Sequence, residues 1–377
     1  SNATEIQNMF EGCESLKSLK LPEKFDAARA INMERMFCNC LSLTSLELPD
    51  GFQTSNAEYM DQLFQGCSEL TSLKLPETFD TSNVTNMYAM FNNCTALTEL
   101  NLSESFDTSN VKNMYAMFAG DSALKKITLG DQFYVQNATD LSAMFSKCSN
   151  LATINGNLIF ASGEGKENQN KATTMASMFN QCSALTSVPF TYEGESEIVQ
   201  FPVLTTMASM FSGCAGLSSI DMGGWQMQDL TNTSSMFKDC SALETLDLSW
   251  TKIAALEEQL SVGDMFNNVS TSATLNVVKE DGIDTLSTFM QAVVDAFKAS
   301  VTNGTVTVDG QPLSDQTTGD EPSGDGPMAE PSGDPTLGTE PGATPADPEN
   351  GGEPGNTNEP SNEGAEQQRA IERRAEQ

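Results

Sequence analysis

A pair of large apolar residues recurs along the first 277 residues at a nearly constant spacing. The first five intervals between pairs are 27 residues long, and the next four are 34, 32, 26 and 29 residues. Repetition with such a period is the signature of a solenoid, in which each coil buries its apolar face against the next coil. The ten pairs are Met9-Phe10, Met36-Phe37, Leu63-Phe64, Met90-Phe91, Met117-Phe118, Met144-Phe145, Met178-Phe179, Met210-Phe211, Met236-Phe237 and Met265-Phe266.

Each repeat combines two apolar patterns with a turn. Met87 and Phe91 are four residues apart, and with the methionine between them they predict one turn of a short helix. Leu100 and Leu102 alternate with polar residues, which predicts a short strand with one buried face. The Asp, Thr, Ser and Asn residues of segment 79–83 predict the corner between coils. We therefore expect an α/β repeat solenoid, a right-handed coil with a parallel sheet on one side.

The repeats stop near residue 278, and a different pattern follows. Apolar residues at helical spacing run from Ile283 to Phe297, with Asp284 as the expected N-cap. A strand is expected at Thr305–Val308, so that residues 279–310 form a C-terminal cap over the last coil. No equivalent cap precedes Ile6, and we expect the solenoid to extend beyond the N-terminal end of this chain.

The remaining segments are assigned from composition and repeat length. Residues 1–3 (Ser-Asn-Ala) resemble the remnant of tag removal, which leaves 4–278 for the solenoid of about ten repeats. Residues 311–377 contain fifteen acidic residues, three arginines and no aromatic residue, which predicts a disordered acidic stalk rich in Pro, Gly and Glu. The two longest repeats predict loops at Ser162–Lys171 and Glu193–Gln200.

The net charge of −33 excludes two classes of partner. Nucleic acid and anionic lipid both require a basic surface, and this chain has 52 acidic residues against 19 basic ones. The sequence contains no run of about 18 apolar residues, so no membrane insertion is expected within it.

The repeat M-x-x-M-F-x-x-C-x-x-L-T-x-L-x-L, joined by F-D-T-S-N-V-x-N, resembles the BspA-like leucine-rich-repeat surface proteins of bacteria, and more narrowly their DUF285-type subgroup. The closest matches to the motif are Phe79–Leu102 and Phe106–Leu129, and the resemblance extends from Ile6 to Val277. It implies a leucine-rich-repeat solenoid at the cell surface or in secreted form, acting in adhesion to host matrix proteins, host cells or other bacteria. It implies no catalytic residue and no cofactor.

Eight of the nine cysteines occupy one position of the repeat, three residues after the phenylalanine. Equivalent side chains of stacked coils are parallel, a geometry that disfavours disulfides, so we expect a ladder of buried thiols. Asp121 and Val269 take this position in two repeats. Only Cys38 lies off the lattice, where a partly exposed thiol is expected.

Several residue types bear on whether the chain is an enzyme. Histidine is absent, which removes the commonest general base and the commonest zinc ligand. Asp26, Asp80 and Asp107 recur because they close turns, and no loop has the dense oxygen ligands of a calcium site. We predict no catalytic residue and no metal site, while an enzyme that uses paired carboxylates stays a third hypothesis.

The outward positions of the strands are the candidate binding surface. They are small, polar and of mixed charge, and they lack the aromatic anchors of tight interfaces, so weak multivalent contacts are expected. Tyr88 and Tyr115 lie on the side opposite the sheet and are interpreted as ordinary surface tyrosines. The outward column of candidate ligand-binding residues is Lys20, Glu47, Lys74, Asn101, Thr128, Asn155, Asp221 and Asp247, with Pro189 in the same register.

Two functions of different classes remain open. The first is a non-enzymatic extracellular adhesion module that contacts a host extracellular-matrix or cell-surface protein, a mucin or a glycan. The second is a structural spacer in a larger surface protein whose recognition domain lies outside this sequence.

Overall fold

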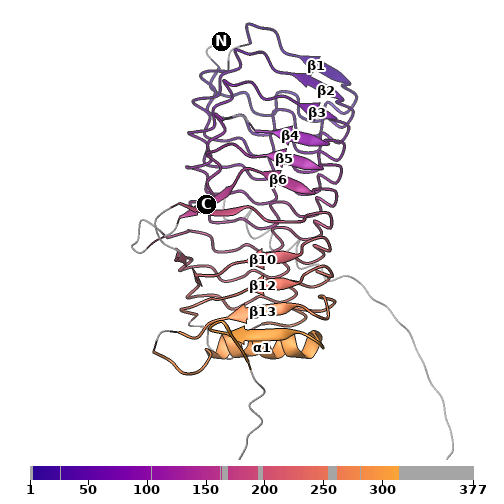
Figure 1. Ribbon diagram of the computed structural model, residues 1–377. Helices are drawn as coiled ribbons and strands as arrows, with labels where there is room; N and C mark the ends of the chain where they lie inside the picture. The colour runs from indigo at the N-terminus through magenta and orange to yellow at the C-terminus, as the bar shows by residue number, and fades with distance from the viewer. Residues whose placement is uncertain are drawn as a thin grey trace, which may run out of the picture. The chain divides into compact units, whose positions relative to one another are not determined.

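The computed structural model describes residues 3–25, 27–102, 104–161, 163, 169–193, 198–253, 261–280 and 282–313. These residues form a solenoid of stacked rungs with short parallel strands on one side and a helix over the last rung (Figure 1). The expected fold class is confirmed. The main strands are β1 (Ser18–Lys20), β2 (Ser45–Glu47), β3 (Ser72–Leu73), β4 (Glu99–Asn101), β5 (Lys126–Thr128), β6 (Thr153–Asn155), β10 (Ser219–Asp221), β12 (Thr245–Asp247) and β13 (Thr274–Val277).

Successive strands pair in parallel at the register that the repeat predicts. Leu19 lies beside Leu46, and Leu100 lies beside Ile127, so apolar residues of equivalent rungs stack in one column. The sheet is interrupted between β6 and β10, where Pro189 takes the outward position without belonging to a strand. Proline has no backbone N–H for the ladder, which accounts for the break.

The predicted helical turn of each repeat is instead a pair of tight turns. Ala89 and Asn93 have φ angles of 51° and 60°, in the left-handed region, and the equivalent residues of the other rungs share this conformation. Their N–H groups therefore leave the coil and donate to the next rung, as from Ala89 N to Tyr115 O at 2.9 Å. A helix would satisfy these groups internally, whereas the stack offers each of them a partner in the neighbouring rung. Met87 and Phe91 are buried, as the pattern predicted.

Phenylalanine rings form the centre of the core. The rings of Phe91, Phe118 and Phe145 stack with centroid distances of 5.4 and 5.1 Å, and their side chains are fully buried. A second column runs through Phe79 and Phe106 at 6.4 Å. Because each ring packs on two others, one rung cannot form this core without its neighbours.

The predicted ladder of buried thiols is confirmed for seven of its eight cysteines, while Cys13 in the first rung is only partly buried. All nine cysteines are free thiols. The ladder thiols donate to the phenylalanine carbonyl of the preceding rung, as from Cys94 Sγ to Phe64 O at 3.3 Å and from Cys148 Sγ to Phe118 O at 3.0 Å. The prediction for Cys38 is wrong: this side chain is fully buried, since the tight turn carries it against Gln65 of the next rung.

Thiol reactivity follows from this burial. Burial raises the pKa of Cys40 to about 11 and those of Cys182 and Cys240 to about 12. Since the thiolate is the reactive species, we expect folded protein to react with a disulfide reagent at pH 8 at no more than one site, the partly exposed Cys13. Denatured, unreduced protein should give nine thiols. A Cys13→Ala variant should lose the fast reaction alone; fewer than nine thiols after denaturation would contradict the ladder.

The inserted residues extend the solenoid where loops were predicted. β7 (Leu158–Ala161) pairs in parallel with β8 (Phe190–Glu193), and β9 (Val199–Gln200) pairs with β11 (Trp225–Gln226), so a second ladder occupies the corner of these rungs. The buried Asn170 accepts from Ala161 N and donates to Ala161 O, both at 3.0 Å, and so takes the place of a strand residue. The loop prediction is thus wrong for these flanks, and residues 162, 164–168 and 194–197 lie outside the described residues.

The C-terminal cap consists of α1 (Thr288–Ser300), β14 (Thr305–Val308) and β15 (Gln311–Pro312). α1 buries its apolar face on the last rung, where Phe297 meets Phe266 edge-on at 5.2 Å. The N-cap is Ser287, which accepts from Met290 N, and the prediction of Asp284 is wrong because the buried face begins only after Ser287.

The cap continues past its expected last residue. β15 pairs antiparallel with β14, so ordered structure continues to residue 313 and the predicted boundary at 310 is too early. The acidic stalk predicted for the rest of the chain lies outside the described residues.

Candidate binding surfaces

The sheet presents the predicted outward column as one continuous line over six rungs. Register pairs join Lys20 to Glu47, Asn101 to Thr128 and Thr128 to Asn155, and a bridge joins Lys74 to Asn101. Alternation along each strand places these side chains outward, because residue 19 and its equivalents are the ones that face the core. The first four residues are exposed, while Thr128 and Asn155 are half-buried.

Charges of opposite sign alternate at the N-terminal end of this column. Lys20 Nζ lies 2.7 Å from Glu47 Oε2, with both side chains largely exposed, so the pair contributes little to stability. Asp221 and Asp247 also face outward but lie beyond the break at Pro189, on β10 and β12. The structure therefore separates the eight predicted residues into a group of six and a pair.

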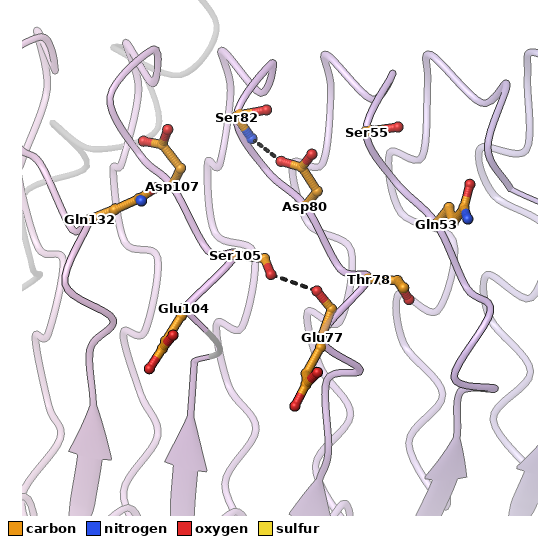
Figure 2. A pocket seen from close by; sticks show the side chains of 10 residues that line it. All are labelled: Gln53, Ser55, Glu77, Thr78, Asp80, Ser82, Glu104, Ser105, Asp107 and Gln132. Carbon is orange, nitrogen blue, oxygen red and sulfur yellow. Dashed lines mark hydrogen bonds between the residues drawn. The ribbon is translucent and has the colours of Figure 1, made fainter.

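A groove of about 590 Å³, which we call the acidic groove, runs beside the ends of the strands, across rungs two to five. Figure 2 shows its polar side chains, with Glu77 and Glu104 pointing toward the strands and Asp80 and Asp107 on the opposite side. Ser105 Oγ donates to Glu77 O, which ties neighbouring rungs together. The lining residues are Gln53, Ser55, Glu77, Thr78, Asp80, Ser82, Glu104, Ser105, Asp107 and Gln132.

The sequence pattern did not reveal this groove, because only segment 79–83 and Asp107 of its surroundings were interpreted, and those as turn formers. That interpretation is confirmed for two aspartates: Asp80 accepts from Ser82 N at 2.9 Å and Asp107 accepts from Ser109 N at 2.7 Å. Asp26 lies outside the described residues. One sequence pattern could have indicated this groove. An acidic residue lies three positions before each aspartate, as Glu77 does before Asp80, so the carboxylates of neighbouring rungs align.

The groove is suited to binding a ligand at the surface rather than to catalysing proton transfer. Asp80 and Asp107 each commit one oxygen to a turn, and the groove is open to solvent on its long side. General acids and bases work at positions shielded from water, where their pKa values shift. Within the part of the chain that the structure describes, no group of three or more acidic or cysteine side chains is placed to hold a metal ion.

Comparison with known protein families agrees with this geometry. The model described as "Mycoplasma protein of unknown function, DUF285" matches residues 74–188 and 156–277, and the "BspA type Leucine rich repeat region (6 copies)" matches residues 1–108. The chain belongs to the DUF285 family and carries BspA-type leucine-rich repeats. The first match spans more than half of the chain, and the two together span the entire solenoid.

Other comparisons add little to the DUF285 assignment. The leucine-rich-repeat protein of T. pallidum, known from a crystal structure, is 20% identical; the alignment covers 56% of this chain and 69% of that one with a TM-score of 0.29. A search of curated proteins gave no match. In the described part of the chain, α1 is too short to cross a membrane. A leucine-rich-repeat solenoid is an architecture typical of protein-interaction modules.

Proposed function

We propose that this DUF285-family chain is a non-enzymatic adhesion module of a bacterial cell surface, which contacts a host matrix protein or mucin through the sheet face and the adjoining acidic groove. The observation that supports the proposal is the outward column from Lys20 to Asn155, which places a polar side chain at the same position of six successive rungs. Repeated weak contacts give avidity when the ligand itself is repetitive. The acidic composition of residues 314–377 is suited to a solvated stalk that holds the module away from the cell.

Binding measured by surface plasmon resonance tests this proposal. We expect the chain to bind at least one member of a panel of immobilised fibronectin, laminin, collagen and mucin. Replacing Glu47 and Lys74 by alanine leaves the net charge unchanged and removes two exposed sheet-face side chains, so the equilibrium response should fall at least threefold. The matched control replaces the exposed Glu58 and Lys112, which lie outside the sheet, and should bind as the natural chain does.

Two outcomes would count against the adhesion proposal. If no surface of the panel retains the folded chain, the chain functions as the structural spacer described above. If the control pair and the sheet pair weaken binding equally, the contact surface is not the sheet.

A further inference from the structure

A second groove, of about 360 Å³, lies over the tight turns at Ala89, Asn93 and their equivalents, in rungs three to six. One wall is formed by Tyr88 and Tyr115, and the floor consists of alanines of the tight turns in successive rungs. Amide side chains form another part of the lining, the amide wall. We call this groove the tyrosine groove; its lining is Gln65, Tyr88, Ala89, Asn92, Asn93, Tyr115, Ala116, Ala119, Gly120, Ala143, Ser146 and Lys147.

The aromatic wall is a rigid platform. The rings of Tyr88 and Tyr115 stack at a centroid distance of 5.4 Å with an interplanar angle of 11°, because equivalent residues of adjacent rungs are in register. The stack ends there, since the next rung has Ser142, whose Oγ bonds to Thr174 Oγ1 at 2.8 Å. Tyr115 is 37% exposed, although it is a large aromatic residue at the end of an ordered stack. Rigid aromatic side chains supply contact area at a small cost in conformational entropy.

Three alanines of the groove, Ala89, Ala116 and Ala143, occupy the first left-handed position of the turn in their rungs. Ala89 and Ala116 have positive φ angles, and both side chains are buried below the level of the tyrosines. Other rungs have Gln62 or Arg35 at this position. In rungs four and five, small residues at this position follow tyrosines, and the groove lies over them.

The amide wall is fixed by its own hydrogen bonds. Gln65 Nε2 donates to Asn92 Oδ1 at 3.3 Å, Asn93 Nδ2 donates to the same oxygen at 2.7 Å, and Asn92 Nδ2 donates to Ala119 O at 2.8 Å. Each amide nitrogen carries a second hydrogen. The wall thus presents neutral donors in defined positions in the groove that the aromatic rings also line.

The charge of the groove selects among ligands. Lys147 is its one charged lining residue, and the Asp61 carboxyl lies near Tyr88 at the N-terminal end. On a chain of net charge −33, a strongly anionic ligand would be repelled. A pyranose ring has the complementary chemistry: one face of C–H groups packs on an aromatic ring, and its hydroxyls accept from amide N–H groups.

We propose that the tyrosine groove is a binding site for neutral saccharides, with Tyr115 as the stacking platform and Gln65, Asn92 and Asn93 as hydroxyl partners. The volume lies within the range of about 300–1,000 Å³ typical of small-ligand sites. This proposal does not depend on the adhesion proposal, because the groove and the sheet face have no residue in common.

Fluorine NMR of protein labelled with 3-fluorotyrosine tests the site directly. Five signals are expected from the five tyrosines. Titration with neutral hexaoses of glucose, mannose or N-acetylglucosamine should shift the signals of Tyr88 and Tyr115 for at least one of them, and leave the other three in place. Isothermal titration calorimetry with the same hexaose gives the dissociation constant of the complex.

Variants separate a ring contact from a general effect on folding. Tyr115→Ala should weaken binding at least tenfold, whereas Tyr115→Phe keeps the platform and should weaken it less than threefold. Tyr59→Ala is the matched control, because Tyr59 is a similarly exposed tyrosine (42%) that does not line the groove. The proposal is overturned if no hexaose shifts the Tyr88 and Tyr115 signals at 10 mM, if only anionic glycans or a protein ligand do, or if Tyr115→Ala binds as tightly as Tyr59→Ala.

Discussion

Replacing Phe118 by alanine should lower the free energy of unfolding by about 3–5 kcal/mol. The Phe118 ring is fully buried between Phe91 and Phe145, at 5.4 and 5.1 Å, so its removal leaves a cavity that the stacked rungs cannot close. The backbone is hydrogen-bonded from rung to rung, as from Phe118 N to Met144 O at 2.8 Å, which limits collapse of the stack into the cavity. Urea denaturation followed by circular dichroism measures the change.

Phe10 provides the matched control for this substitution. It occupies the equivalent position in the first rung, but it stacks on Phe37 alone, at 5.6 Å, and is only partly buried. Phe10→Ala should therefore cost less than half as much as Phe118→Ala. Equal losses of unfolding free energy in the two variants would show that a ring packed between two others contributes no more to stability than a ring packed on one.

The Asp121→Cys variant should be more stable than the natural chain by on the order of 1–3 kcal/mol at pH 7. Asp121 interrupts the thiol ladder between Cys94 and Cys148 and is fully buried; its Oδ1 accepts from Cys94 N at 2.7 Å, and its Oδ2 has no hydrogen-bond partner. Burial raises the pKa of this carboxyl well above its usual value. A cysteine would match the other rungs, and Cys94 N would keep its bond to Phe91 O.

The sign of the pH dependence follows from the raised pKa. The folded chain retains the Asp121 proton at pH values where the unfolded chain has lost it, so the stabilising contribution is complete below about pH 4 and is lost as the pH rises toward the folded-state pKa. Within that interval the natural chain should lose stability relative to Asp121→Cys as the pH rises. The measurement is urea denaturation of both proteins at pH 4, 5.5 and 7.

Other buried carboxyl groups also make the stability of the chain fall as the pH rises, but their contribution is the same in both proteins and cancels. Burial raises the pKa of Asp61 to about 6 and also raises that of Asp140, and both residues are present in the two proteins. Asp121→Asn, which removes the charge and keeps an acceptor for Cys94 N, should share the weaker pH dependence of Asp121→Cys. A stability difference that stays constant from pH 4 to 7 would contradict the assignment to Asp121.

The outward orientation of the strand residues was predictable from the sequence, and the two grooves were not. Strand alternation alone places Lys20 and Glu47 outward, because their neighbours Leu19 and Leu46 must face the core. The acidic groove and the tyrosine groove depend on how residues of different rungs align around a turn. The 27-residue spacing places Tyr88 and Tyr115 on adjacent rungs, but it does not show that their rings stack at 5.4 Å.

The order of the apolar residues by itself determined the solenoid, the register of its rungs, the thiol ladder and the presence of a helical cap. These features follow from burial, and burial depends on a pair of apolar residues that recurs in ten repeats. Only the tertiary structure decided the backbone of the turns and the extra ladder of β7, β8, β9 and β11. The physical reason is that these N–H groups find their acceptors in the neighbouring rung, a partner that spacing within a single repeat does not reveal.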